Sequence, residues 1–249
     1  MYFGRAFAAK NSALPELPSG AESVPDHPTA EHEAKRILAS AGIPVVREVL
    51  VTSADAAAKE AATLGGKVVL KIASPDIAHK TEIGGVLVGL EGADAVRDGF
   101  ATLMERAAEK RPDAAIDGVI VCEMVSGGVE TVVGVQLDPV LGPAVMFGLG
   151  GILVEVLKDV SFRLAPFSVE EAHRMIREIK GYKVLEGVRG APPADIGALA
   201  EALSKLSVFA AANADKLDSI DINPFIVLPE GQGAVAVDAL IVPSASRKD

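Results

Sequence analysis

The most informative stretch of the chain, residues 70–86, reads Leu70-Lys71-Ile72-Ala73-Ser74-Pro75-Asp76-Ile77-Ala78-His79-Lys80-Thr81-Glu82-Ile83-Gly84-Gly85-Val86. An apolar, β-type segment carries one lysine, a polar loop holds one histidine, and a Gly-Gly pair leads into a second apolar segment. Lysine supplies a point charge for phosphate oxygens, and glycines let backbone N–H groups approach those oxygens closely. The stretch therefore predicts a phosphate-binding loop that carries its own nucleophile.

The lysine and the histidine of this loop also have structural interpretations. A lysine is rarely buried unless it is paired, so Lys71 taken alone is expected to point to solvent. Most single loop histidines have no chemical role, and His79 taken alone would be one of them. Because Lys80, Gly84 and Gly85 accompany it, and because a neutral imidazole is a competent nucleophile near pH 7, the phosphate interpretation is favoured for the whole loop.

The composition excludes several classes of partner. The chain has 249 residues, 49% of them apolar and 4% aromatic, so we expect an aliphatic core. Its formal net charge of −10 argues against nucleic acid and anionic membranes, because both attract basic surfaces. No apolar run reaches the ~18 residues of a membrane span, and the single cysteine, Cys122, fits a reducing compartment. We expect a cytoplasmic protein with no nucleic-acid or membrane partner.

The expected elements give an α+β fold of two lobes with a cleft between them. Residues 1–28 are rich in Pro, Ser and Glu, which indicates a flexible arm or linker. The first lobe is expected at 29–115 and the second at 116–249. A turn at Ser126-Gly127-Gly128 would join two strands of the second lobe in a hairpin. Helices are expected at 29–41, 52–65, 93–110, after Ser168 and at 195–214, with Thr29, Thr52 and Ser168 as N-caps; strands are expected at 45–51, 67–73, 85–90, 119–125, 130–137, 144–147, 217–228 and 234–242.

The last two expected strands predict a metal site. If their turn is centred on Glu230-Gly231, Asn223 and Asp238 lie at equal distances from it and face each other across the hairpin. Opposed residues of an antiparallel pair have Cβ atoms ~5 Å apart, close enough to share one cation. An amide oxygen and a carboxylate suit Mg²⁺, and the same register places Asp221 on this face. The alternative is a merely polar outer face, and a one-residue slip would separate the two side chains.

Three further segments carry weaker signals. Glu123 lies in an apolar run between the lobes, where the backbone could meet an adenine edge, or it is an exposed strand residue. Glu130, beyond the turn, could reach a ribose hydroxyl. The glycine-rich segment 148–151 precedes Glu155 and combines a glycine loop with a carboxylate, although a lone glycine cluster is weakly specific.

Together these segments resemble the ATP-grasp domain of the ADP-forming acyl-CoA (acetyl-CoA) synthetases, a family related to the succinyl-CoA synthetase β subunit. The matching segments follow the family order. They are 71–81, 84–86, 147–155, 158–166, 221–225 and 237–239.

The resemblance implies an ATP-grasp fold with ATP between the lobes and Mg²⁺ at the hairpin. His79 would carry a phosphoryl group from the nucleotide to a partner module, and Lys71 with the metal would offset the charge on that group. The implied ATP-binding residues are Lys71, Ser74, Gly84, Gly85, Glu123, Val125 and Glu130; the implied metal ligands are Asn223 and Asp238, with Glu155 and Asp221 as additional candidates.

The implied reaction is acid + CoA + ATP giving acyl-CoA + ADP + phosphate, in either direction. Complete enzymes of the family also need a CoA-binding Rossmann domain and ligase domains with a second phosphohistidine, and this sequence shows neither. The chain is therefore expected to require an α-type CoA-binding/ligase subunit or module, in a hetero-oligomer, with the carboxylic acid and CoA bound at the partner's site.

Two competing interpretations remain. A nucleotide-sensing, synthetase-like domain of a regulatory protein or acyltransferase would bind ATP without turnover. A carboxylate–amine ligase of the ATP-grasp type would transfer phosphate directly to a bound carboxylate and would need no relay histidine. The presence of His79 together with Lys71, Asn223 and Asp238 favours the acyl-CoA synthetase component.

Overall fold

The computed structural model describes residues 13–27, 29–77, 80–151, 158–188 and 190–244. Its contacts divide the chain into two compact units: a small unit, residues 46–126, and a large unit, residues 1–45 together with 127–249. Each unit combines helices with its own antiparallel sheet, which confirms the predicted α+β class.

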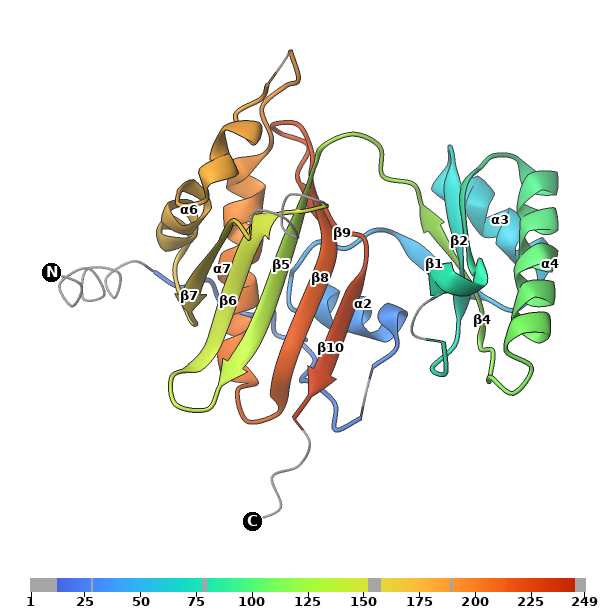
Figure 1. The fold of residues 1–249 in the computed structure, drawn as a ribbon, viewed down its shortest axis with the longest axis horizontal. Coiled ribbons are helices and arrows are strands. Elements are labelled where there is room, and N and C mark those ends of the chain that lie inside the picture. The colour runs from blue at the N-terminus through green and yellow to red at the C-terminus, as the bar shows by residue number, and fades with distance from the viewer. Residues whose placement is uncertain (1–12, 28, 78–79, 152–157, 189, 245–249) are drawn as a thin grey trace, which may run out of the picture. The chain divides into compact units, whose positions relative to one another are not determined.

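The small unit is a four-stranded antiparallel sheet with two helices on one face. The sheet has the order β1-β4-β2-β3, and α3 and α4 pack against it (Figure 1). Because side chains alternate along a strand, Val68, Leu70 and Ile72 of β2 enter the core beneath these helices. The elements are β1 (Glu48–Val51), α3 (Ala54–Leu64), β2 (Val68–Ala73), a 3₁₀ turn η2 (Lys80–Ile83), β3 (Val86–Leu90), α4 (Ala93–Lys110) and β4 (Gly118–Glu123).

Gly99 explains how closely α4 approaches this sheet. A Cβ atom added at Gly99 would lie 2.7 Å from Leu90 Cδ1 and 3.1 Å from Leu70 Cδ1. A larger residue would push the helix off β2 and β3, and β2 is the strand that carries Lys71.

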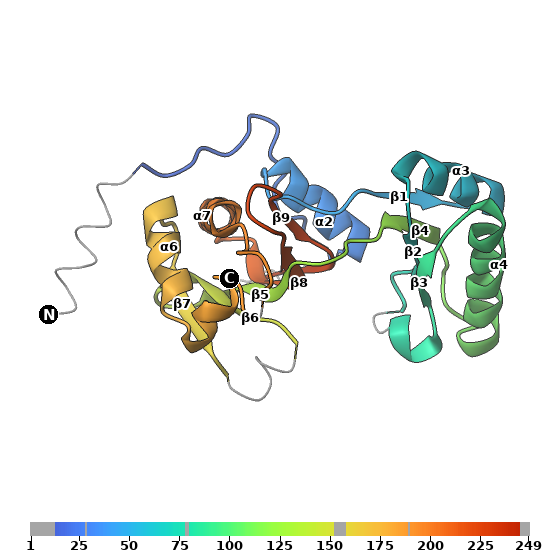
Figure 2. The same cartoon turned by 90° about the horizontal axis from the view of Figure 1, so that it is seen from above.

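The large unit is built on a six-stranded antiparallel sheet. Its main path is β10-β8-β5-β6-β7, and β9 pairs with β8 beside β10. Figure 2 shows α6, α7 and α2 together on one side of this sheet. The elements are α2 (Glu31–Ser40), β5 (Val129–Asp138), β6 (Gly142–Leu149), β7 (Val160–Leu164), α6 (Val169–Arg177), a 3₁₀ turn η3 (Lys180–Val184), α7 (Ile196–Ala212), β8 (Leu217–Val227), β9 (Ala234–Ala236) and β10 (Ala239–Pro243).

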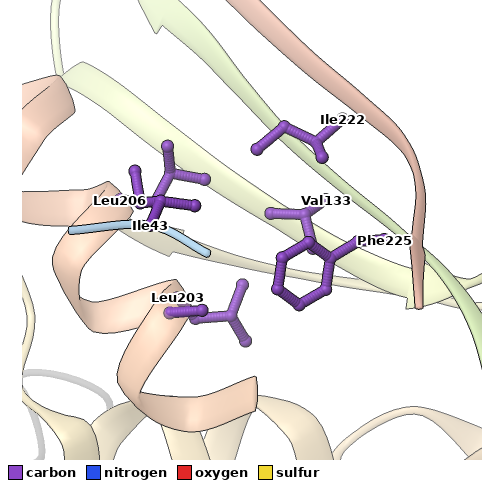
Figure 3. Close-up of a pocket in the computed structure, with 7 residues that line it drawn as sticks. Ile43, Val133, Leu203, Leu206, Ile222 and Phe225 are labelled. Atoms are coloured by element: carbon purple, nitrogen blue, oxygen red, sulfur yellow. The ribbon is translucent and has the colours of Figure 1, made fainter. Parts of the chain in front are cut away.

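The core of the large unit lies between α7 and the sheet. Figure 3 shows Leu203 and Leu206 of α7 facing Val133 of β5 and Phe225 of β8 across this core. Ile43, from the segment after α2, enters the same cluster. The residues are aliphatic apart from a few phenylalanines, as the composition predicts, and burial of such side chains is the main stabilising contribution to the fold.

Three local predictions differ from the structure. Residues 126–128 were expected to form a hairpin turn, but the strands that flank them belong to different sheets: β4 pairs with β1 and β2, and β5 with β6 and β8. The contacts also group 29–45 with the large unit and 116–126 with the small unit, unlike the predicted lobe ranges. The expected strand 234–242 is two strands, interrupted at Val237 and Asp238.

Two predicted helix caps are also wrong. Thr29 does not cap α2; its hydroxyl donates to the Ile241 carbonyl at 3.0 Å, a long-range contact that sequence cannot show. The N-cap of α3 is not Thr52 but the next residue, Ser53, whose side chain accepts a hydrogen bond from the Ala56 N–H. The Ser168 cap of α6 is confirmed, and Asp195 caps α7 in the same way.

Candidate functional site

Lys71 is the fourth of the six residues of β2, an inner strand of the small sheet between β4 and β3. It pairs with Ile120 on one side and Val86 on the other, and it is 7% exposed. This burial does not fit the alternative in which Lys71 points to solvent. A buried ammonium needs an anionic or polar partner, and the anion-binding interpretation favoured for the whole loop, with a phosphate bound by Lys71, stays a prediction.

The polar loop leaves β2 through a hydrogen-bonded stem. Ser74 is buried, and its hydroxyl oxygen accepts from the Asp76 N–H at 3.1 Å. The Asp76 carboxylate accepts from the Ala115 N–H at 2.8 Å, and its carbonyl accepts from Arg111 at 2.9 Å. The segment that leads to His79 is thus anchored to the end of α4. His79 itself lies outside the described residues.

The two glycines close the other end of the loop. Gly84 has φ of 66°, which favours glycine, and its carbonyl accepts from Arg106 of α4 at 2.8 Å. The N–H groups of Gly84 and Gly85 donate to Thr81 and Lys80 carbonyls at 3.0 and 2.8 Å. Both amides therefore have internal partners, so binding of phosphate by these N–H groups stays a prediction that requires the loop to rearrange.

Glu123 ends β4, and its carboxylate is held by an arginine. Arg47 Nε lies 2.7 Å from Glu123 Oε2, and the Arg47 N–H donates to Oε1 at 3.1 Å. The Glu123 side chain thus ties the end of β4 to Arg47, the residue before β1, and contact of this segment's backbone with an adenine stays a prediction. Val125, just beyond, is half-buried outside the strand, with a backbone N–H that no described residue accepts.

Glu130 is exposed at the start of β5, beside the glycine-rich loop. Its carbonyl accepts from the Gly150 N–H at 2.8 Å, and a Cβ on Gly150 would lie 3.1 Å from that carbonyl. A Cβ atom would be tightly placed here, so glycine favours the close approach of this loop to β5. Glu155 lies outside the described residues.

The register predicted for the last hairpin is confirmed. Phe225 pairs with Ala236, and Asp221 with Leu240, on either side of the interruption. Between them the Asn223 N–H donates to the Asp238 carbonyl at 3.2 Å, so the two residues face each other as predicted. Burial raises the pKa of the Asp221 carboxyl above its ordinary value.

The donors at this hairpin fit Mg²⁺ in kind. Asn223, Asp238 and Asp221 offer only oxygen atoms, which Mg²⁺ prefers, and a nucleotide-bound Mg²⁺ takes only one or two carboxylates from protein because phosphates and waters fill the rest. The described residues contain no group of three or more His, Cys, Asp or Glu side chains that could hold a metal ion.

Sequence reasoning missed one charged residue behind this hairpin. Lys35 of α2 is 1% exposed; its ammonium lies 2.9 Å from Glu31 Oε1 and 3.1 Å from the Val237 carbonyl. The available signal was a Glu–Lys pair four residues apart on the apolar side of a helix. Pairs at this spacing usually lie on the exposed side of a helix, so the pair gave no sign of a buried charge.

The two α+β units and their oxygen-lined hairpin define a class, the ATP-grasp proteins. The sequence profile of the ATP-grasp domain matches residues 21–242, and the chain belongs to this family. Within it, the chain is 44% identical over 217 residues to the β subunit of acetate–CoA ligase [ADP-forming] I of Pyrococcus furiosus, covering 87% of this chain and 92% of that subunit. The resemblance stated from the motifs is thereby confirmed.

Two other relatives extend the comparison. The 4-hydroxybutyrate–CoA ligase [ADP-forming] of Nitrosopumilus maritimus is 42% identical over 211 residues, which are 85% of this chain but 30% of that protein. A structure of acetyl-coenzyme A synthetase 1 of Ca. Korarchaeum cryptofilum, with coenzyme A and Mg-AMPPCP, superposes with a TM-score of 0.76 at 39% identity, covering 87% of this chain and 92% of that one. In it a phosphohistidine segment points towards the nucleotide binding site.

The described part of the chain contains no helix that is long and apolar enough to cross a membrane.

Proposed function

We propose that this chain is the nucleotide-binding, phosphoryl-transferring β-type component of an ADP-forming acyl-CoA synthetase. The observation that carries the proposal is the match to a β subunit over nearly its whole length, in a chain whose sequence contains both the lysine–histidine loop and the Asn–Asp hairpin. ATP and Mg²⁺ are the cofactors, in keeping with the Mg-AMPPCP bound by the Korarchaeum relative.

Each site residue has a proposed role. His79 attacks the γ-phosphorus of ATP, a new N–P bond forms as the P–O bond to ADP breaks, and the imidazole proton leaves to solvent. Lys71 binds the transferred group, and Asn223 and Asp238 hold Mg²⁺, which offsets charge on the phosphates. Glu155 and Asp221 are additional candidate ligands. Ser74, Gly84 and Gly85 line the phosphate side; Glu123, Val125 and Glu130 line the adenosine side.

A partner completes the reaction in this proposal. The Pyrococcus relative is a subunit, and in the Nitrosopumilus relative the matching region is less than a third of one chain. We place the carboxylic acid and CoA on an α-type CoA-binding/ligase subunit or module, which receives the phosphoryl group from His79. A soluble pool of ATP and CoA makes the cytoplasm the proposed compartment.

The test is transfer of γ-labelled phosphate from ATP in the presence of Mg²⁺. We expect acid-labile, base-stable label on the wild-type chain and none on His79→Asn, with ADP binding unchanged. His27→Asn, which removes an exposed loop histidine, is the matched control and should label normally.

The assay is repeated with the α-type partner added. Absence of label under both conditions, with ADP binding intact, would contradict phosphoryl transfer and favour the nucleotide-sensing alternative. Label that persists on His79→Asn would show that another residue is the acceptor.

A further inference from the structure

We propose that Lys35 is a positioning residue for Asp238: it sets the orientation of the candidate magnesium ligand from behind the hairpin. The inference rests on the proposed function, because it assigns a role to Lys35 through that metal site.

Lys35 is a buried charge whose partners link a helix to the hairpin. Its side chain is among the largest fully buried ones, and Glu31 beside it is 8% exposed. The ammonium bonds Glu31 Oε1 at 2.9 Å within α2 and reaches across to the Val237 carbonyl at 3.1 Å. A buried cation is costly unless it is paired, so these contacts hold it in one place.

The bond to Val237 acts on Asp238 through the peptide plane. The carbonyl of Val237 and the nitrogen and Cα of Asp238 belong to one planar peptide unit, so fixing that carbonyl restrains where the Asp238 Cα lies and limits the directions that its side chain can take. These two residues interrupt the strands, β9 ending at Ala236 and β10 beginning at Ala239. Regular ladder pairing on its own therefore does not determine their orientation.

Two backbone hydrogen bonds between β8 and residues 237–238 add to this restraint. The Val237 N–H donates to the Pro224 carbonyl at 3.0 Å, and the Asp238 carbonyl accepts from the Asn223 N–H at 3.2 Å. These two bonds hold the peptide units on either side of the 237–238 peptide, and Lys35 holds the 237–238 unit itself. Metal ligands depend on such outer contacts for their geometry.

The helix that carries Lys35 is itself fastened to the same strands. The Thr29 hydroxyl donates to the Ile241 carbonyl at 3.0 Å, and the Pro44 carbonyl after the helix accepts from the Ala236 N–H at 2.9 Å. The segment 29–44 is therefore bonded to the hairpin on both sides of the interruption, at Ala236 before it and at Ile241 after it. Lys35 lies in the sequence between the two residues, Thr29 and Pro44, that make these contacts.

The experiment measures how much Mg²⁺ strengthens ADP binding to the full chain. Calorimetry gives the Kd of ADP with excess Mg²⁺ and with EDTA, and the ratio of the two is the metal-dependent gain. Asp238→Asn should lower this gain. Lys35→Met should lower it by about tenfold, as loss of an outer contact to a metal ligand does. The Kd in EDTA should stay within twofold of wild type, which a general loss of structure would not allow.

The controls separate charge, folding and position. Arg36→Met removes a neighbouring, exposed cation from the same helix and should leave the gain unchanged. The double variant Glu31→Gln/Lys35→Met removes both buried charges, and proteins often tolerate the removal of a whole buried ion pair better than the removal of one partner. It therefore keeps the measurement possible if Lys35→Met alone does not fold. This double variant should show the same reduced gain.

A double-mutant cycle decides the mechanism. If Lys35 acts through Asp238, then Lys35→Met changes nothing further in the Asp238→Asn background. Additive effects of the two substitutions on the metal-dependent gain would overturn the positioning role of Lys35 but not the metal site. A normal gain in Lys35→Met together with a reduced gain in Asp238→Asn would do the same. An unchanged gain in Asp238→Asn would overturn the metal site itself, and the role of Lys35 with it.

Discussion

The small and large units hold their candidate residues in different ways. In the small unit, Lys71, Ser74 and the two glycines come from one strand–loop–strand passage of residues 71–85. In the large unit, Asn223 and Asp238 meet only because two strands pair in one register, and Lys35, from a helix near the beginning of the chain, bonds the carbonyl of the neighbouring residue, Val237. A local motif is therefore readable in sequence, whereas a site built by long-range pairing requires a correct fold first.

Each unit also contains a buried lysine, and the two are buried for different reasons. Lys71 is 7% exposed on a strand that leads into a polar loop, and Lys35 is 1% exposed on a helix with a glutamate one turn away. We assign substrate binding to the first and positioning to the second. Burial of a lysine by itself does not distinguish the two roles; the partners do.

The largest effects on stability are expected when a large side chain is truncated in the hydrophobic core of either unit. Phe209→Ala in the large unit should lower the free energy of unfolding by about 3–5 kcal/mol, and Leu70→Ala in the small unit by about 2–5 kcal/mol, since both side chains are fully buried. Hydrogen exchange followed by mass spectrometry should show faster exchange only in the unit that carries the substitution.

Val88→Ala is the control for the small unit, because Val88 is 62% exposed on β3 and should change the stability by less than about 0.5 kcal/mol. If Leu70→Ala accelerates exchange equally in residues 127–244, the two units share one cooperative core and the comparison above fails.

A smaller, pH-dependent effect is expected at Asp195 in the large unit. Hydrogen bonds from the N–H of Ala198, and from Gly233 and Gly231, hold the pKa of this carboxyl below its ordinary value of 3.8, although desolvation opposes them. A depressed pKa means that the carboxylate stabilises the fold above pH 3.8 and that this stabilisation is lost as the pH falls through the lower, folded-state value.

Asp195→Ala should therefore destabilise the protein by about 1–2 kcal/mol at pH 7, and the difference from wild type should shrink as the medium becomes more acidic than pH 3.8. Chemical denaturation between pH 7 and pH 3 measures it. Asp218→Asn, at an exposed position of β8, serves as the control. A difference that is constant with pH would mean that the charge of Asp195 contributes nothing.

The smallest effect on stability is expected at the N-cap of α3 in the small unit. Ser53→Ala removes the side chain that caps α3 and should lower stability by about 1 kcal/mol. Thr52→Ala, one residue earlier and exposed, should have little effect. Thermal unfolding of the two variants side by side measures the difference; equal losses would place the cap at neither residue.

The chain's hairpin and its glycine turn show how far sequence reasoning reaches. The Asn223–Asp238 register was predictable because a short turn centred on Glu230-Gly231 fixes which residues face each other. The same reasoning failed at Ser126-Gly127-Gly128, because two strands joined by a glycine turn can leave for different sheets. Nothing in the turn residues distinguishes these outcomes; the pairing partners of β4 and β5 do.

By itself the sequence determined the family, the α+β class, the lysine–histidine loop and the facing of Asn223 and Asp238, since these depend on short spacings and alternating patterns. The three-dimensional fold was needed to show which segments share a unit, that Thr29 bonds Ile241, that Lys71 is buried, and that Lys35 bonds the carbonyl of Val237, next to Asp238. These contacts join residues as many as 212 positions apart, and the free energy of burying and pairing them is gained only when the whole sheet has formed.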